Sequence, residues 1–126
     1  MRQLPELVIP KQWWLTSNMR LHWAEKARRT RNIRQYAALT WRGLEHTGGW
    51  PILITAKIQY PGTGRADPAN AAPTLKACID GGTDAGLWPD DDSTHVIGPL
   101  PIRETGKSPK GVYVIRFSLI DQHVNF

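Results

Sequence analysis

Carboxylates are concentrated in one stretch of a chain that is otherwise basic. The 126 residues carry a net charge of +5, yet no Lys or Arg occurs between Lys76 and Arg103. The aspartates in that interval are Asp80, Asp84, Asp90, Asp91 and Asp92. Clustered carboxylates repel one another unless a cation lies between them, and hard divalent ions such as Mg²⁺ are bound by oxygen ligands. The stretch therefore predicts a metal site, with a solvated turn after Pro89 as the alternative.

A strand is expected to bring further polar side chains toward these acids. Residues 52–60 alternate apolar and polar side chains, a pattern typical of a strand with one buried face. The proline and glycines of residues 61–64 end this strand, so Arg65 and Asp67 are expected on the loop that leaves it. Loops held by a rigid strand commonly carry functional side chains.

A second helix is expected to begin at Pro73, because proline suits the first helical position, where its missing N–H would have no partner anyway. Lys76, Asp80 and Asp84 follow at four-residue steps and share one face of this helix. Either they form a plain surface ion pair or Lys76 neutralises a phosphate. Gly81-Gly82 weakens the helix, and close packing against a partner is one reason for such glycines.

Together these residues resemble the RusA-type Holliday junction resolvases, which are small dimeric Mg²⁺-dependent DNA endonucleases of phage and bacteria. The family pattern begins R-x-D-x-D-N, continues with a lysine and ends with a pair of aspartates. The matching positions are Arg65, Asp67, Asn70, Lys76, Asp80-Gly81, Gly86 and Asp90-Asp91. Ser17-Asn18 and His22-Trp23 also resemble the family's opening loop, so the likeness covers most of the chain.

The resemblance implies a catalytic site and a metal site. Asp67, Lys76 and Asp91 would be catalytic, and Asp67, Asp90 and Asp91 would hold Mg²⁺, with Mn²⁺ as a possible substitute. Bound Mg²⁺ would lower the pKa of a water molecule, and Lys76 would stabilise charge on the phosphate or the leaving oxygen. The implied activity is that of a crossover junction endodeoxyribonuclease. As a homodimer it would make paired symmetric nicks in four-way DNA junctions during recombination and repair.

The chain departs from the family pattern at Ala69, which stands where the second acid of D-x-D is expected, and Asn70 lies further from Lys76 than in the shorter pattern. The missing ligand is either replaced by another oxygen, from Asp80, Asp90, Asp92 or a backbone carbonyl, or the chain is a weakened nuclease that still binds junction DNA. A third interpretation is a basic protein that binds RNA or a protein partner, with the acidic turn merely solvated.

A basic helix is expected over residues 22–45. The residues expected to bind DNA are Arg20, Lys26, Arg28, Arg29, Arg31, Arg34, Arg65 and Asn70. At about 100° per residue, Lys26 and Arg29 point with the apolar stripe, whereas Arg28 and Arg31 point the opposite way. The first pair is therefore expected nearer the scissile DNA. A solvated charged face is the alternative.

Length and periodicity indicate one domain over residues 1–126, because a chain of this size buries a modest but sufficient core. Strands are expected at 6–10, 52–60, 95–102 and 112–120, with a polar hairpin connection at 104–111 between the last two. This order predicts an α+β fold, with a single layer of mixed, about four-stranded sheet and two helices packed on it.

The cysteine content and the lengths of the apolar runs indicate where in the cell the protein is expected. Cys78 is the only cysteine, so no intrachain disulfide can form, and its apolar neighbours predict a buried packing role. No apolar run reaches the length of a membrane span, and the first residues lead into no signal-type apolar core. We therefore expect a cytoplasmic protein that does not bind membranes. Its sequence pI near 9.7 suggests a polyanionic partner.

Overall fold

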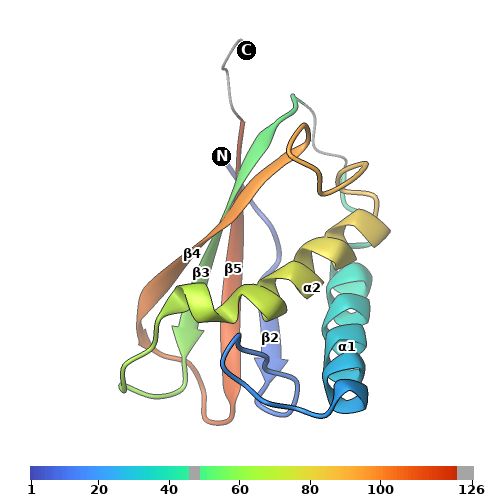
Figure 1. Cartoon of the computed structure of the whole chain (residues 1–126). Coiled ribbons are helices and arrows are strands. Elements are labelled where there is room, and N and C mark those ends of the chain that lie inside the picture. The colour runs from blue at the N-terminus through green and yellow to red at the C-terminus, as the bar shows by residue number, and fades with distance from the viewer. Residues whose placement is uncertain (46–48, 122–126) are drawn as a thin grey trace.

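The computed structural model of the chain describes residues 1–45 and 49–121. Its elements are β1 (Arg2–Gln3), β2 (Leu7–Pro10), α1 (Trp23–Trp41), β3 (Ile52–Tyr60), the 3₁₀ helix η1 (Pro68–Ala71), α2 (Ala72–Asp84), β4 (Val96–Lys107) and β5 (Val112–Asp121). They form one mixed five-stranded sheet and two α-helices, as Figure 1 shows. The predicted α+β class is confirmed, with the short β1 as an additional strand.

The last strand, β5, holds most of the sheet together. It pairs antiparallel with β1 and β2 on one side and with β3 on the other. β3 in turn pairs in parallel with β4, which forms the far edge. The predicted hairpin at 104–111 is therefore wrong, because β4 and β5 are separated by β3. β4 continues to Lys107, and the Ser108 N–H donates to the Tyr60 carbonyl at 2.9 Å as the chain passes the end of β3.

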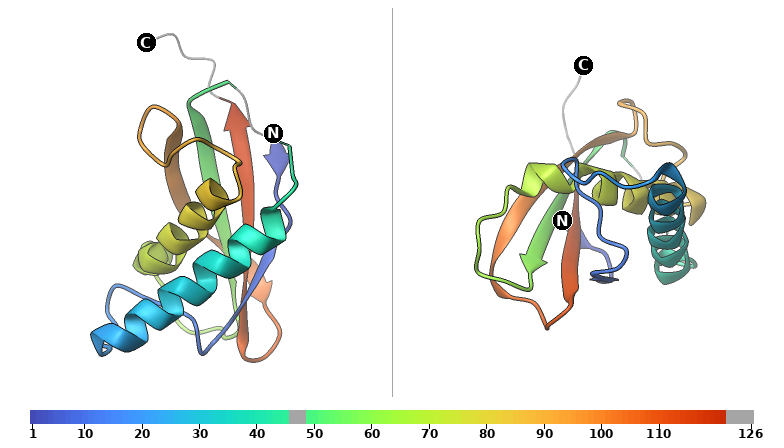
Figure 2. Two further views of the ribbon diagram at one scale, coloured as in Figure 1. Left: turned by 90° about the vertical axis from the view of Figure 1, so that its right-hand side faces the viewer. Right: turned by 60° about the horizontal axis from the view of Figure 1, so that its bottom comes forward.

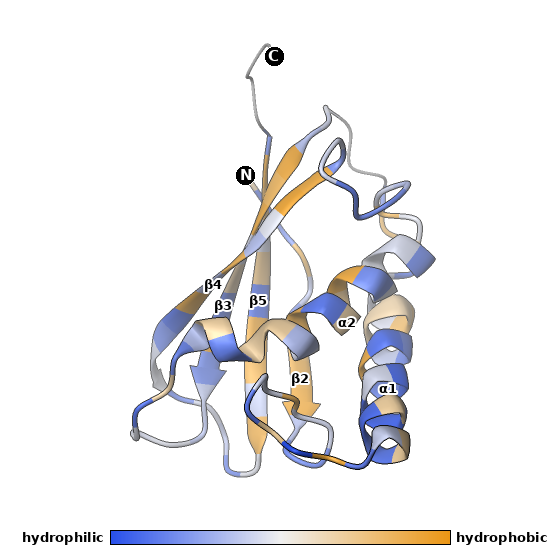
Figure 3. Ribbon diagram, in the orientation of Figure 1, coloured by the Kyte–Doolittle hydropathy of each residue, from blue (hydrophilic) through white to orange (hydrophobic). Residues whose placement is uncertain are grey.

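The core lies between the sheet and the helices, which lie on the same side of it (Figures 1 and 2). The alternating apolar side chains of β3 at positions 52, 54, 56 and 58 are fully buried, as the sequence pattern predicts. Trp41 of α1 packs edge-on against Phe117 of β5, with ring centroids 5.3 Å apart. In Figure 3 the strands are largely apolar, whereas the first half of α1 is mostly hydrophilic.

The helix α1 ends four residues earlier than the composition suggests. Arg42 takes an extended backbone conformation directly after Trp41, and Gly43 has a φ of 84°, which favours glycine. The buried Trp41 fixes this end, since its indole N–H donates to the Pro5 carbonyl at 3.0 Å. In the part of the chain that the structure describes, neither helix is long and apolar enough to cross a membrane.

The glycines of α2 pack within the chain. A Cβ added at Gly81 would lie 2.6 Å from the Arg34 carbonyl oxygen of α1, and one at Gly82 would lie 2.1 Å from the Trp88 ring. Close approach of α1 and Trp88 therefore accounts for both glycines without a partner subunit. Cys78 of the same helix is fully buried, as predicted, and burial raises the pKa of its thiol.

Candidate functional site

A lysine and two carboxylates meet on the exposed side of α2. The Lys76 Nζ donates to Asp80 Oδ1 at 2.9 Å and also to the carboxylate of Asp91. Helical spacing brings Asp80 to Lys76, and the turns after Trp88 bring Asp91 back to the same helix face. A cavity of about 510 Å³ opens beside them, lined by Lys76, Asp91 and Ala69 together with apolar side chains of α2 and β4.

The charges of this cluster support one another. The hydrogen bonds that Lys76 donates to Asp91 and then to Asp80 raise its pKa above the ordinary value. In the other direction, the hydrogen bond from Lys76 lowers the pKa of Asp91. Lys76 therefore carries a proton at neutral pH and can stabilise an anion, whereas it cannot accept a proton as a base. Asp91 is ionised under the same conditions and can bind a cation.

Asp67 lies in a neighbouring part of the molecule. Its carboxylate Oδ1 accepts the Ala69 N–H at 3.0 Å and so caps the start of η1. With Arg65 and Asn70 it lines a cavity of about 320 Å³, which Thr16, Asn18 and Tyr60 also border. The Ser17 N–H donates to the Asn70 carbonyl at 2.8 Å, which ties the N-terminal loop to this cavity. The two segments that resemble the family's opening loop and its first motif thus come together.

The expected metal ligands do not converge on one point as free side chains. Asp67 lines a different cavity from Asp91, and Asp90 is exposed, with its Oδ1 accepting the Asp91 N–H at 2.7 Å. Within residues 1–45 and 49–121, no three His, Cys, Asp or Glu side chains gather as a group able to hold a metal ion. Asp80 and Asp91 instead share Lys76, and Ala69 borders the cavity of Lys76 and Asp91.

The donor chemistry nevertheless fits Mg²⁺. This ion is usually held by one or two carboxylates plus waters and substrate phosphates, and does not need a cage made only of protein ligands. Asp91, with Asp80 beside it, supplies such a carboxylate set. Position 69 borders the same cavity, so an acidic side chain there would add a further oxygen donor where this chain has Ala69.

Several of the basic residues of α1 are engaged within the chain. Arg28 and Arg29 both donate to the Glu25 carboxylate, and Arg29 also donates to the Trp14 carbonyl at 2.9 Å. Arg34 forms a two-point ion pair with Asp84 of α2, at 2.6 and 2.8 Å. Arg29 is thus turned toward the N-terminal loop. Its closeness to DNA stays a prediction.

Four of the basic side chains expected to bind DNA remain available. Within the described residues, no hydrogen bond or ion pair engages the side chains of Arg20, Lys26, Arg31 or Arg65. Arg65 and Arg20 border two cavities that adjoin each other, while Lys26 and Arg31 are exposed on α1. The basic surface that can meet a polyanion is therefore smaller than the charge count suggests.

Arg103 of β4 was not predicted as a site residue. Its guanidinium donates to the carbonyls of Gly64 at 2.8 Å and Gly62 at 3.2 Å, and it lies over the Tyr60 ring at 5.0 Å from the ring centroid. It thereby holds the loop that carries Arg65 and Asp67. The one sequence signal is that Arg103 is the first cation after the acidic stretch, which does not reveal its partners.

Glu25 accepts hydrogen bonds from Arg28 and Arg29 and so limits how many arginines of α1 are free to bind DNA. Hydrogen bonds from Arg28 and then Arg29 lower its pKa from 4.5 to about 2. These pairs therefore stabilise the fold above pH 4.5 and are lost as pH falls toward 2. We expect Glu25→Gln to strengthen binding to duplex DNA at neutral pH. The slope of log affinity against log salt should steepen by up to about 1.8, or 0.9 for each arginine that gains a phosphate.

The matched control is Glu45→Gln, which changes net charge equally. The exposed Glu45 side chain forms no hydrogen bond or ion pair in the described part of the chain. Titration of labelled duplex at several salt concentrations, by fluorescence anisotropy, measures both slopes. Equal slopes for the two variants would show that Arg28 and Arg29 do not reach phosphate even when released.

Comparison of the chain with models of protein families and with curated protein sequences gives no match. A proposal for the function of the chain therefore has to be argued from its residues and their geometry.

Proposed function

We propose that the chain is a Mg²⁺-dependent endonuclease that resolves four-way DNA junctions by paired nicks. It would act as a homodimer in the cytoplasm, in recombination and repair. The observation that carries the proposal is the meeting of protonated Lys76 with the ionised Asp91 on the wall of a cavity. A cation beside a carboxylate that can bind metal suits hydrolysis of a phosphodiester.

Each residue has a role that its contacts allow. Asp91, assisted by Asp80, would hold the ion, which when bound lowers the pKa of water and neutralises phosphate charge. Once Asp91 is neutralised in this way, Lys76 is free to turn from the carboxylates to the phosphate. Its exposed ammonium group has the freedom to do so, since 64% of the side chain's surface is accessible.

The second cavity would receive the neighbouring part of the strand. Arg65 supplies a cation and Asn70 an amide there, and such groups fix the position of a DNA backbone without reading its sequence. Asp67 is fixed by its bond to the Ala69 N–H and by the loop that Arg103 holds. From its own cavity, Asp67 would act on the ion through bound waters, from the side of η1.

A second candidate function is junction binding without cleavage. Ala69 borders the cavity of Lys76 and Asp91 but offers no oxygen from its side chain. The loss of that donor weakens metal binding, while the cations that meet phosphate are unaffected. The basic surface would then still recognise the shape of a branched DNA.

The test is incubation of the purified protein with a synthetic four-way junction in Mg²⁺, beside a linear duplex of the same sequence. We expect paired nicks in the junction alone, seen after denaturing electrophoresis, and their loss in Asp91→Asn. Asp121→Asn at the end of β5 is the matched control, because it removes an exposed carboxylate away from the cavity.

Tight junction binding without nicks would favour the second candidate. In that case Ala69→Asp tests whether only one ligand is missing, because it should then restore nicking. Absence of both binding and nicking would contradict both candidates.

A further inference from the structure

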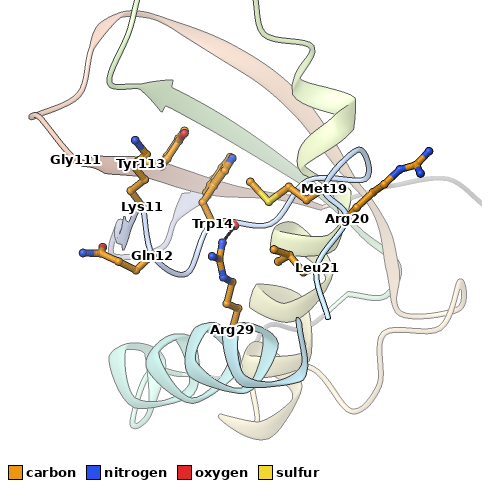
Figure 4. Close-up of a pocket in the computed structure, with 9 residues that line it drawn as sticks. All are labelled: Lys11, Gln12, Trp14, Met19, Arg20, Leu21, Arg29, Gly111 and Tyr113. Carbon is orange, nitrogen blue, oxygen red and sulfur yellow. Dashed lines mark hydrogen bonds between the residues drawn. The ribbon is translucent and has the colours of Figure 1, made fainter. Parts of the chain in front are cut away.

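A third cavity lies on the side of the molecule where the N-terminal loop, α1 and the start of β5 meet (Figure 4). It measures about 580 Å³, and Trp14, Met19, Leu21 and Tyr113 supply its apolar wall. The Trp14 and Tyr113 rings are stacked, with centroids 3.9 Å apart and planes 2° from parallel. Trp14 is only 3% exposed, so it holds the partly buried Tyr113 ring in a fixed position. The wall is thus rigid and suits a flat apolar group.

Cations surround this wall, and none of the described lining residues is Asp or Glu. Arg29 is fixed by its bonds to the Trp14 carbonyl at 2.9 Å and to Glu25 at 2.8 Å. Within the described residues the side chains of Lys11 and Arg20 form no hydrogen bond or ion pair. Figure 4 shows these two on opposite sides of the cavity. The cavity therefore offers two separate places for an anion, with an apolar surface between them.

We propose that this cavity binds one unpaired nucleotide within a DNA strand. The base would lie against Met19, Leu21 and Tyr113, and the phosphates on its two sides would meet Lys11 and Arg20. Bases stack on aromatic side chains regardless of sequence, and a cavity of this size accommodates a nucleotide. A nucleotide inside a strand carries a phosphate on each side, whereas a free mononucleotide carries one.

The position of the cavity explains how such a strand would run. Trp14, Met19 and Tyr113 also border the cavity that contains Arg65 and Asp67, so the two cavities adjoin. A strand whose backbone passes Asp67 would place a neighbouring nucleotide against Tyr113. The inference rests on the proposed function for the identity of the strand. It adds that an unpaired base at the branch point is held outside the duplex.

The two methionines of the chain, Met1 and Met19, give a direct test. With ¹³C-methyl methionine, Met19 reports on the cavity and the exposed Met1 serves as an internal control. The protein is titrated in EDTA with pentadeoxyadenylate, with the same pentamer lacking all of its bases, with deoxyadenosine monophosphate and with inorganic phosphate. We expect the intact pentamer to shift the Met19 signal alone. It should bind at least about 5-fold more tightly than the abasic pentamer and more tightly than the mononucleotide.

The cations are tested by the double variant Lys11→Ala/Arg20→Ala. Its slope of log affinity against log salt for the pentamer should be shallower by about 1.4, or 0.7 for each lost phosphate contact. Lys57→Ala/Lys107→Ala removes equal charge from β3 and the end of β4, away from the cavity, and should leave the slope unchanged.

The proposal is overturned if Met19 does not respond to the pentamer, or if phosphate or the abasic pentamer gives an equal response. Equal affinity for the mononucleotide would also overturn it, because the site would then be one for free nucleotides. Because EDTA removes metal ions from these titrations, their outcome does not depend on cleavage of DNA. An unresponsive Met19 in a protein that nicks junctions removes only this inference, whereas a responsive Met19 without nicking removes only the proposed activity.

Discussion

Replacing Lys76 by glutamine should slow junction nicking at least about 100-fold, the effect of removing one donor that stabilises a developing oxyanion. Its raised pKa keeps Lys76 charged at neutral pH, and Gln keeps the length and polarity of the side chain while removing the charge. Thermal stability should change little, because exposed ion pairs of this kind contribute under about 1 kcal/mol. Single-turnover rates on a labelled junction, with melting curves of the same samples, measure both effects.

Lys57→Gln is the matched control for that experiment, since it removes an exposed lysine from β3 at a distance from the cavity. Lys76→Arg should recover part of the rate, because the positive charge is kept while the geometry differs. A nicking rate for Lys76→Gln within a few-fold of that of the parent protein would remove Lys76 from the proposed mechanism. In that case Asp91 would have to support nicking without the lysine.

The largest expected effect on stability comes from Gly82→Ala. The added methyl group would lie 2.1 and 2.6 Å from two carbons of the Trp88 ring. Trp88 is 1% exposed, and its indole N–H donates to the Thr83 hydroxyl at 2.9 Å, so the ring has no open space to move into. Overpacking of a core costs about 1–3 kcal/mol and occasionally more, whereas alanine gains about 1 kcal/mol in helix propensity. We expect a net loss of about 1–2 kcal/mol, measured by urea unfolding.

Gly62→Ala is the matched control. A Cβ at Gly62 meets nothing within 4 Å, and its φ does not lie in the left-handed region, so the free energy of unfolding should stay within about 0.5 kcal/mol. If Gly82→Ala were as stable as the parent, the helix preference would outweigh the overlap. The Trp88 ring would then have to lie elsewhere in the folded protein.

Local patterns in the sequence predicted the elements better than their pairing. The alternation of β3 sets both its bounds and its buried face, because a side-chain period of two leaves no other choice when one face is covered. The order of β4 and β5 could not be read in the same way. Two strands joined by a polar turn predict a hairpin, whereas the parallel pairing of β3 with β4 depends on residues over 40 positions apart.

The site was predictable to a similar extent. The pairing of Arg28 and Arg29 with Glu25 follows from three- and four-residue spacing on a helix, and so does that of Lys76 with Asp80. The ion pair of Arg34 with Asp84 joins two helices 50 residues apart, and no local pattern indicates it. The same holds for the separation of Asp67 from Asp91, because only the capping of η1 turns the first carboxylate toward its own cavity.

The central place of β5 has a consequence for how the protein is made. Strands β1, β2 and β3 all pair with β5, and Tyr113 of β5 borders both adjoining cavities. Synthesis proceeds from the N-terminus, so most of the sheet lacks its partner until residues 112–121 have left the ribosome. The two adjoining cavities that Tyr113 borders, which are proposed to bind nucleic acid, are assembled only at that stage. A growing chain would thus lack these two proposed binding cavities until its synthesis is nearly finished.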